Sequence, residues 1–198
     1  VLELDCNIND PAFADEKEKY LYWDRIEAYG PKLMGLPICW HVEDALFVNM
    51  DKVKEAGFDE TFVEDWDTFV ECVTAMTKGS ETYGLGMGMR PGGFGGWYQR
   101  APSAGGRYLP EDRRAPAINT PEVVAETQRL IDFFTQGIAP PQGTFDYNTA
   151  PDAFSAGRLA TYSSDLTIAA VLKGKPTPPA FEWAVLPWPP GQAARASF

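Results

Sequence analysis

The densest group of chemically active side chains falls within five positions of the sequence. It brings together an indole, an imidazole and two carboxylates, in Trp40, His41, Glu43 and Asp44. A strand buried in a core rarely carries so many polar groups, because each would lose its hydration. Apolar runs of strand length flank the group, at residues 32–38 and 45–50. The pattern predicts a hinge beside a binding cleft, with the polar insert facing the cleft.

Nucleophilic catalysis and metal binding find little support around this group. His41 is the only histidine, and no Gly-x-Ser-x-Gly motif supplies a serine for a Ser-His-Asp triad. His41 and Glu43 could ligate a metal, but the cysteine or histidine partners of common zinc sites are missing. The glycine-rich run at residues 84–96 lacks the Gly-Lys-Ser/Thr ending of a phosphate-binding loop. We therefore expect no metal site and no cofactor.

The overall composition narrows the classes of partner. A net charge of −11 disfavours nucleic acid or an anionic membrane surface as the main partner. Cys6, Cys39 and Cys72 form no Cys-x-x-Cys pair, so we expect buried thiols, with a single disulfide as the alternative. The sequence contains no recognisable signal peptide and no apolar segment long enough to span a bilayer.

Apolar periodicity and capping residues predict alternating strands and helices. Strands are expected at residues 45–50, 83–89, 159–163 and 183–189. Helices are expected at residues 51–57, 66–78, 121–136, 150–156 and 165–172. Asp51, Thr120 and Asp165 are the expected helix caps, while Gly57 and Gly137 are the expected helix ends. The alternation predicts an α/β sheet covered on both faces.

The predicted helix at residues 121–136 has an apolar stripe that should face the core. The stripe comprises Val123, Val124, Leu130, Ile131 and Phe134.

Eight short sequence motifs follow one another along the chain. They are GLP at 35–37, LFVN at 46–49, AG at 56–57, WD at 66–67, SAGG at 103–106, NTPE at 119–122, AFSAGR at 153–158 and WAVLP at 183–187. In this order they resemble the extracellular solute-binding proteins of sugar ABC transporters. No single motif is specific, but their order over most of the chain is.

The resemblance implies a fold and a division into lobes. The fold class is α/β, a periplasmic-binding-protein-like lobe of type II with a mixed sheet flanked by helices, plus a partial second lobe. Residues 1–42 would belong to lobe 1, residues 43–183 would form lobe 2, and residues 184–198 would be the strand that returns to lobe 1. The chain would then be an internal fragment of a longer protein.

The resemblance also implies a function. The protein would bind a sugar or related small solute by closure of two lobes and deliver it to the permease of an ABC transporter. It would be a monomer, periplasmic or extracellular, with or without a lipid anchor, and not an enzyme. A glycoside-acting hydrolase, which needs two carboxylates across a cleft, and a non-catalytic interaction module are the alternatives.

Sugar binding calls for aromatic faces that stack on apolar C–H surfaces and for short polar groups that satisfy hydroxyls. Phe94, Trp97 and Tyr98 follow the glycine-rich run and are candidates for stacking, although they could instead begin the core of a following helix. Arg90 could bind hydroxyls or an anionic group of the ligand, or it could be a surface arginine.

The remaining candidates lie at a strand-to-helix junction and near the proposed lobe crossings. Ser164 and Asp165 could receive a polar ligand, and Asp165 could equally be a helix cap. Leu166 stands where many relatives have a stacking tryptophan, so the specificity could differ from that of common oligosaccharide binders. Trp40 and Trp188 could each be a ligand platform or could pack at the hinge.

Overall fold

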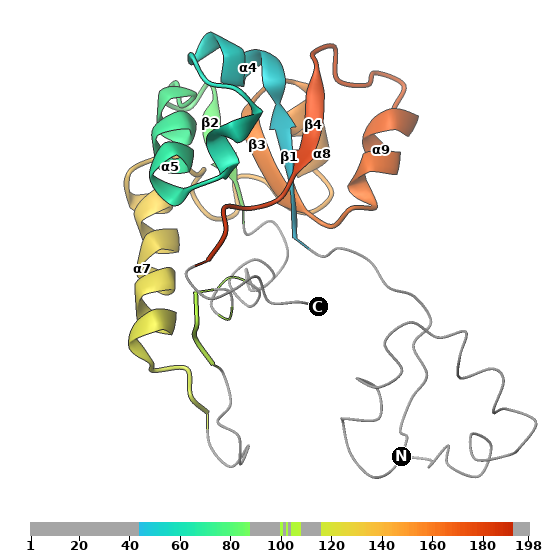
Figure 1. Cartoon of the computed structure of the whole chain (residues 1–198). Coiled ribbons are helices and arrows are strands. Elements are labelled where there is room, and N and C mark those ends of the chain that lie inside the picture. Colours follow the sequence, from blue (N-terminus) through green and yellow to red (C-terminus); the bar gives the residue numbers. More distant parts are fainter. Residues whose placement is uncertain (1–43, 88–99, 101, 103, 108–115, 192–198) are drawn as a thin grey trace, which may run out of the picture. The chain divides into compact units, whose positions relative to one another are not determined.

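The computed structural model describes residues 44–87, 100, 102, 104–107 and 116–191 (Figure 1). The chain divides into two compact units, Val1–His41 and Val42–Phe198. The first unit, with the strand predicted at residues 32–38, lies outside the described residues. The lobe boundaries at residues 42 and 183 remain a prediction.

The second unit is built on a four-stranded mixed sheet with the strand order β2-β3-β1-β4. The strands are β1 (Ala45–Asn49), β2 (Tyr83–Gly86), β3 (Leu159–Ser164) and β4 (Trp183–Leu186). β1 pairs antiparallel with both β3 and β4, whereas β2 pairs parallel with β3. The central residue of β1, Phe47, lies opposite Tyr162 on one side and Val185 on the other. Residues 184–186 therefore belong to the same sheet as β1.

Strand β1 supplies both halves of the core because successive side chains point to opposite faces of a sheet. Leu46 and Val48 pack into one buried cluster, while Ala45 and Phe47 pack into the other. All five residues of the strand are buried. The prediction of a sheet covered on both faces is confirmed.

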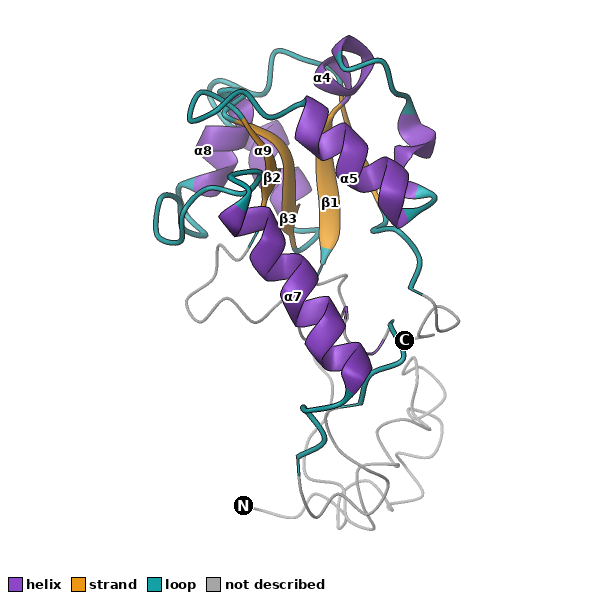
Figure 2. Ribbon diagram, turned by 90° about the vertical axis from the view of Figure 1, so that its left-hand side faces the viewer, coloured by secondary structure: helices purple, strands orange, loops and turns teal. Residues whose placement is uncertain are grey.

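Helices cover the two faces of the sheet (Figures 1 and 2). The first cluster takes side chains from α4 (Met50–Glu55), the 3-10 helix η2 (Glu60–Val63), α5 (Trp66–Ala75) and α7 (Pro121–Thr135). The second cluster takes side chains from α8 (Ala150–Ser155) and α9 (Ile168–Gly174). No helix in the described part of the chain is long and apolar enough to cross a membrane.

Most of the expected helix ends are confirmed, and two helix starts are wrong. Thr120 caps α7 by accepting the Val123 amide, and Gly57 and Gly137 adopt the left-handed conformation after α4 and α7. The helix predicted from Asp51 begins at Met50. Its cap is Asn49, whose side chain accepts the Lys52 amide at 3.1 Å.

The helix predicted from Asp165 begins three residues later, at Ile168. The carboxylate of Asp165 accepts the backbone amide and the hydroxyl of Thr167. It therefore holds a tight turn ahead of the helix, because a short acidic side chain competes with the helix for nearby amides.

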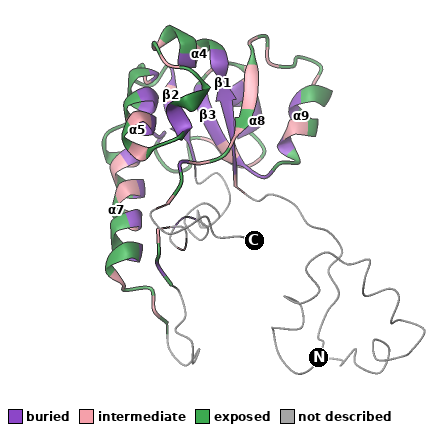
Figure 3. Ribbon diagram, viewed as in Figure 1, coloured by how far each residue is buried: buried purple, intermediate pink, exposed green. Residues whose placement is uncertain are grey.

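The stripe predicted for α7 is wrong at two positions. Val124 and Ile131 are 52% and 46% exposed. The side chains that α7 buries are instead those of Val123, Glu126, Leu130 and Phe133. Figure 3 shows buried and exposed positions alternating along this helix. An acidic residue thus occupies a core-facing position of this helix.

Glycine is required where β2 meets α5. A Cβ atom on Gly84 would lie 1.8 Å from the carbonyl oxygen of Val73, in the body of α5. The close approach is held by two threonine hydroxyls. Thr77 accepts the Gly84 amide at 3.1 Å, and Thr161 donates to the Gly84 carbonyl at 2.7 Å.

The thiol of Cys72 is expected to resist alkylation in the folded protein. It is free and fully buried in α5, and burial raises its pKa from 9.0 to about 12. At pH 8 this lowers the reactive thiolate fraction by about a thousandfold relative to an unfolded chain. Peptide mapping after iodoacetamide treatment should find Cys72 labelled only when denaturant is present. Equally fast labelling of Cys72 in the native protein would contradict the described packing.

Candidate functional site

The strand ends bring several predicted site residues to one edge of the sheet. β1 begins at this edge, and β2, β3 and β4 end there, because β1 runs antiparallel to β3 and β4 while β2 runs parallel to β3. We call it the lower edge, after its position in Figure 1. Asp44 precedes β1, Ser164 and Asp165 close β3, and Trp188 follows β4.

Asp44 is held by two donors at the lower edge. Ser163 donates its hydroxyl to one carboxylate oxygen, and Arg100 Nη1 donates to the other at 3.2 Å. Only 5% of each charged side chain of this ion pair is exposed. Since an isolated buried charge is very costly, each of these two groups needs the other.

Arg100 extends this pair into a larger buried cluster. Its guanidinium lies 4.1 Å from the centroid of the Trp188 ring, and its Nε lies 3.8 Å from Glu126 Oε1. Glu126 Oε2 accepts a hydrogen bond of 3.2 Å from Arg129, which is one turn further along α7. We call this group the Arg100 cluster. It comprises Asp44, Arg100, Glu126, Arg129, Ser163 and Trp188.

Aromatic rings complete the surroundings of the cluster. Trp188 stacks on Trp66 with ring centroids 6.1 Å apart and lies 5.4 Å from the ring of Phe69. Arg129 covers Trp66 at 4.3 Å. The Trp188 indole Nε1 is buried, with no hydrogen-bond partner among the residues that the structure describes. These contacts fit the packing interpretation of Trp188, while its role as a ligand platform remains a prediction.

Sequence reasoning missed Glu126, Arg129 and Arg100 as members of the site. Glu126 is 2% exposed, and burial raises the pKa of its carboxyl, against the opposing effect of Arg129 and Arg100. One signal was available, because Glu126 has the helical spacing of the buried residues Val123 and Leu130. A charged residue on such a face indicates a buried partner of opposite charge.

Replacing Glu126 by glutamine is expected to change how stability depends on pH. A carboxyl whose pKa is raised by folding contributes stability below its unfolded pKa, near 4.5, and loses it as pH rises through the folded pKa. The Glu126→Gln variant has no such group. Its free energy of unfolding should therefore improve relative to wild type as pH rises from 4 towards neutrality.

Urea titrations of both proteins across this range measure that difference. Glu122→Gln is the control, because Glu122 is exposed on the same helix. A difference that is constant with pH would contradict the raised pKa of Glu126.

The predicted pair at the end of β3 is buried, and the carboxylate of Asp165 accepts hydrogen bonds from within the protein. Ser164 is 8% exposed and Asp165 is 2% exposed. Besides the turn that it holds with Thr167, Asp165 accepts a 3.0 Å hydrogen bond from the Tyr147 hydroxyl. Neighbouring groups are more accessible, since Leu166 and Thr167 are exposed and Ser163 is half-buried.

Seven of the predicted site residues lie outside the described residues. They are Trp40, His41, Glu43, Arg90, Phe94, Trp97 and Tyr98. Their roles remain predictions.

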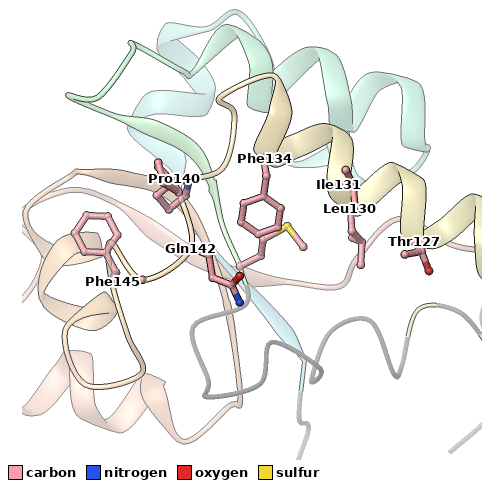
Figure 4. A pocket seen from close by; sticks show the side chains of 10 residues that line it. Thr127, Leu130, Ile131, Phe134, Pro140, Gln142 and Phe145 are labelled. Atoms are coloured by element: carbon pink, nitrogen blue, oxygen red, sulfur yellow. The ribbon is translucent and has the colours of Figure 1, made fainter.

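A separate pocket of about 390 Å³ lies between α7, the end of β2 and residues 140–145 (Figure 4). Its lining is mostly apolar, including Met87, Leu130, Phe134 and Phe145. None of the four predicted site residues that the structure describes, Asp44, Ser164, Asp165 and Trp188, lines it. Within the described ranges, no group of three or more His, Cys, Asp or Glu could hold a metal ion.

Comparison with known proteins identifies the family. A family model for bacterial extracellular solute-binding proteins matches residues 7–198. The chain belongs to this family of solute-binding proteins. The search of curated proteins found no match.

The fold of this solute-binding protein is shared with many solved structures. An ABC substrate-binding protein from Listeria monocytogenes in complex with cycloalternan matches 98% of this chain with a TM-score of 0.76 and 19% identity. An ABC transporter solute-binding protein from Thermotoga lettingae with bound α-D-tagatose matches 96% with a TM-score of 0.75 and 16% identity. UgpB from Mycobacterium tuberculosis in complex with glycerophosphocholine matches 96% with a TM-score of 0.72 and 16% identity.

The chain spans about half the length of the solved structures that it matches. It covers 49%, 49% and 48% of the three proteins above. At these identities the likeness shows the fold, and it confirms a lobe of the periplasmic-binding-protein type. The matched family is extracellular, which agrees with the predicted periplasmic or extracellular location of this solute-binding protein.

Proposed function

We propose that this solute-binding protein captures a sugar or related small solute and delivers it to the permease of an ABC transporter. One observation carries the proposal, namely that four strand ends converge on the lower edge of the sheet. In α/β proteins, ligands bind where strand ends and their loops meet. Relatives of the same fold bind cycloalternan, α-D-tagatose and glycerophosphocholine, which all carry hydroxyl groups.

The accessible side chains of the lower edge have the chemistry that a polyol needs. The hydroxyl protons of Ser163 and Thr167 are donated to Asp44 and Asp165, so their oxygens offer acceptors for the hydroxyl groups of a ligand. Leu166 offers an apolar surface for C–H groups. Ser163 is itself a member of the Arg100 cluster, because its hydroxyl donates to Asp44. Binding on both lobes would stabilise the closed form, which is differential binding and requires no catalysis.

Calorimetry on the full-length protein tests the function. The panel contains maltose, D-tagatose and glycerophosphocholine, and we expect one class to bind reversibly without added metal. A ligand at a hundred times its Kd adds about 2.7 kcal/mol to the free energy of unfolding, which thermal melts detect easily. Chromatography of the mixture should recover the ligand intact. Cleaved products would favour the hydrolase alternative, and the absence of binding across the panel would contradict the proposal.

Leu166→Asp should weaken ligand binding without unfolding the protein. Leu166 is 42% exposed at the lower edge, so an aspartate there stays hydrated, but it replaces apolar ligand contact with a charge. We expect Kd to rise about tenfold, in line with the loss of one buried apolar contact. The matched control is Val171→Asp, at an exposed position of α9. Equal Kd values in the two variants would mean that Leu166 does not contact the ligand.

A further inference from the structure

A single guanidinium joins the two places where the chain enters and leaves the sheet. Arg100 donates to Asp44, directly before β1, and covers Trp188, two residues after β4. Asp44 in turn accepts from Ser163 near the end of β3. Arg100 is therefore connected, directly or through Asp44, to residues at the ends of three strands, β1, β3 and β4.

Helix α7 adds two more charged residues to the Asp44–Arg100 ion pair. Glu126 Oε1 lies 3.8 Å from Arg100 Nε, and Glu126 Oε2 accepts from Arg129 at 3.2 Å. The charges along this chain alternate as negative, positive, negative and positive, from Asp44 to Arg129. Removing the Glu126 carboxylate would leave two guanidinium groups without the negative charge that they share.

Net stability is a poor explanation for such a chain of buried charges. Desolvation of buried ion pairs commonly cancels their attraction, and apolar replacements of similar volume are often as stable. A network of this kind does restrict geometry. Asp44 and Glu126 each accept a guanidinium hydrogen bond of 3.2 Å, and the charges of Arg100 and Glu126 hold these two pairs together at 3.8 Å.

We propose that Glu126 is a positioning residue that acts through Arg100 to fix Asp44 and Trp188 at the lower edge. Through these two residues it sets the affinity with which the lower edge binds a ligand, although Glu126 is not at a strand end itself. The effect on affinity rests on the proposed function. The positioning itself does not, because it concerns contacts within the ligand-free protein.

A mutant cycle on the full-length protein tests the positioning. Glu126→Gln and Asp44→Asn are measured singly and together by urea unfolding, in the wild-type background and in the Arg100→Met background. We expect their effects on the unfolding equilibrium constant to be non-additive by about fivefold or more when Arg100 is present. In Arg100→Met the two changes should become additive. Additivity in both backgrounds, or the same coupling in both, would overturn the proposal.

The fluorescence of Trp188 gives a second readout that general loss of stability would not move. Each protein is also made with the Trp188→Phe substitution. Subtracting the emission spectrum of this derivative from the spectrum of the parent protein gives the contribution of Trp188. The difference spectrum should change in Glu126→Gln, should be largely restored in Glu126→Asp, and should stay unchanged in Glu122→Gln. An identical difference spectrum in wild type and Glu126→Gln would overturn the proposal.

Affinity measurements then connect the positioning to function. For maltose, or whichever panel member binds wild type, Kd should rise about tenfold in Glu126→Gln and recover to within about threefold of wild type in Glu126→Asp. An unchanged Kd in Glu126→Gln would overturn the inferred effect on affinity. If wild type binds no panel member, the proposed function fails, and the mutant cycle and the Trp188 spectrum alone decide whether Glu126 positions Arg100.

Discussion

Replacing Gly84 by alanine is expected to destabilise the protein by about 3 kcal/mol or more. The new Cβ would lie 1.8 Å from the Val73 carbonyl oxygen and 2.7 Å from the Val73 carbonyl carbon. These are backbone atoms in the last turn of α5, so the conflict cannot be relieved by a side-chain rotation. Either the helix or β2 has to move, and both belong to the same core. Urea unfolding followed by circular dichroism measures the loss.

Gly174→Ala is the matched control. A Cβ at this last residue of α9 would meet nothing within 4 Å. Alanine is favoured over glycine in a helix, so this variant should be as stable as wild type or slightly more stable. Equal stability of Gly84→Ala and Gly174→Ala would mean that β2 does not pack directly on the backbone of α5.

Arg100→Met is expected to cost about 3–5 kcal/mol, the usual range when one partner of a buried ion pair is removed. Methionine fills similar space but leaves Asp44 with Ser163 as its remaining donor among the described residues, in a site where the carboxylate side chain is 5% exposed. It also removes a positive charge beside Glu126 and the cation that covers Trp188. Denaturant unfolding at pH 7 gives the magnitude.

A second ion pair provides the comparison for Arg100→Met. Lys54 bonds Glu182 at 2.5 Å, but the two side chains are 58% and 65% exposed. Exposed pairs are screened by water and contribute little, so Lys54→Met should change stability only slightly. If the two methionine variants were equally stable, burial of the Asp44–Arg100 pair would not be what makes Arg100 necessary.

The positions of strands and helices could be predicted because their signals are local. Thr120 followed by proline marks the start of α7, and Gly137 marks its end. A short, continuous apolar run identifies β1 equally well. The errors also have local causes. Asn49 caps α4 ahead of Asp51, and Asp165 uses its carboxylate for a turn before α9 begins.

The Arg100 cluster could not be predicted in the same way because its contacts are not local. Glu126 and Arg129 share a helix, but Asp44, Arg100 and Trp188 come from segments that are remote from it in sequence. The apolar character of Val124 and Ile131 favoured them over Glu126 for the core face of α7. The choice was wrong because burial of Glu126 depends on guanidinium groups whose position only the folded chain defines.

The placement of β4 beside β1 has a consequence for protein engineering. The first and last strands that the structure describes are direct neighbours, with Leu46 opposite Leu186, and paired strands lie about 4.8 Å apart. The residues just before β1 and just after β4 therefore leave the sheet side by side. Domain insertion and circular permutation both need chain ends that lie close together, because a short linker then joins them at little cost in chain entropy.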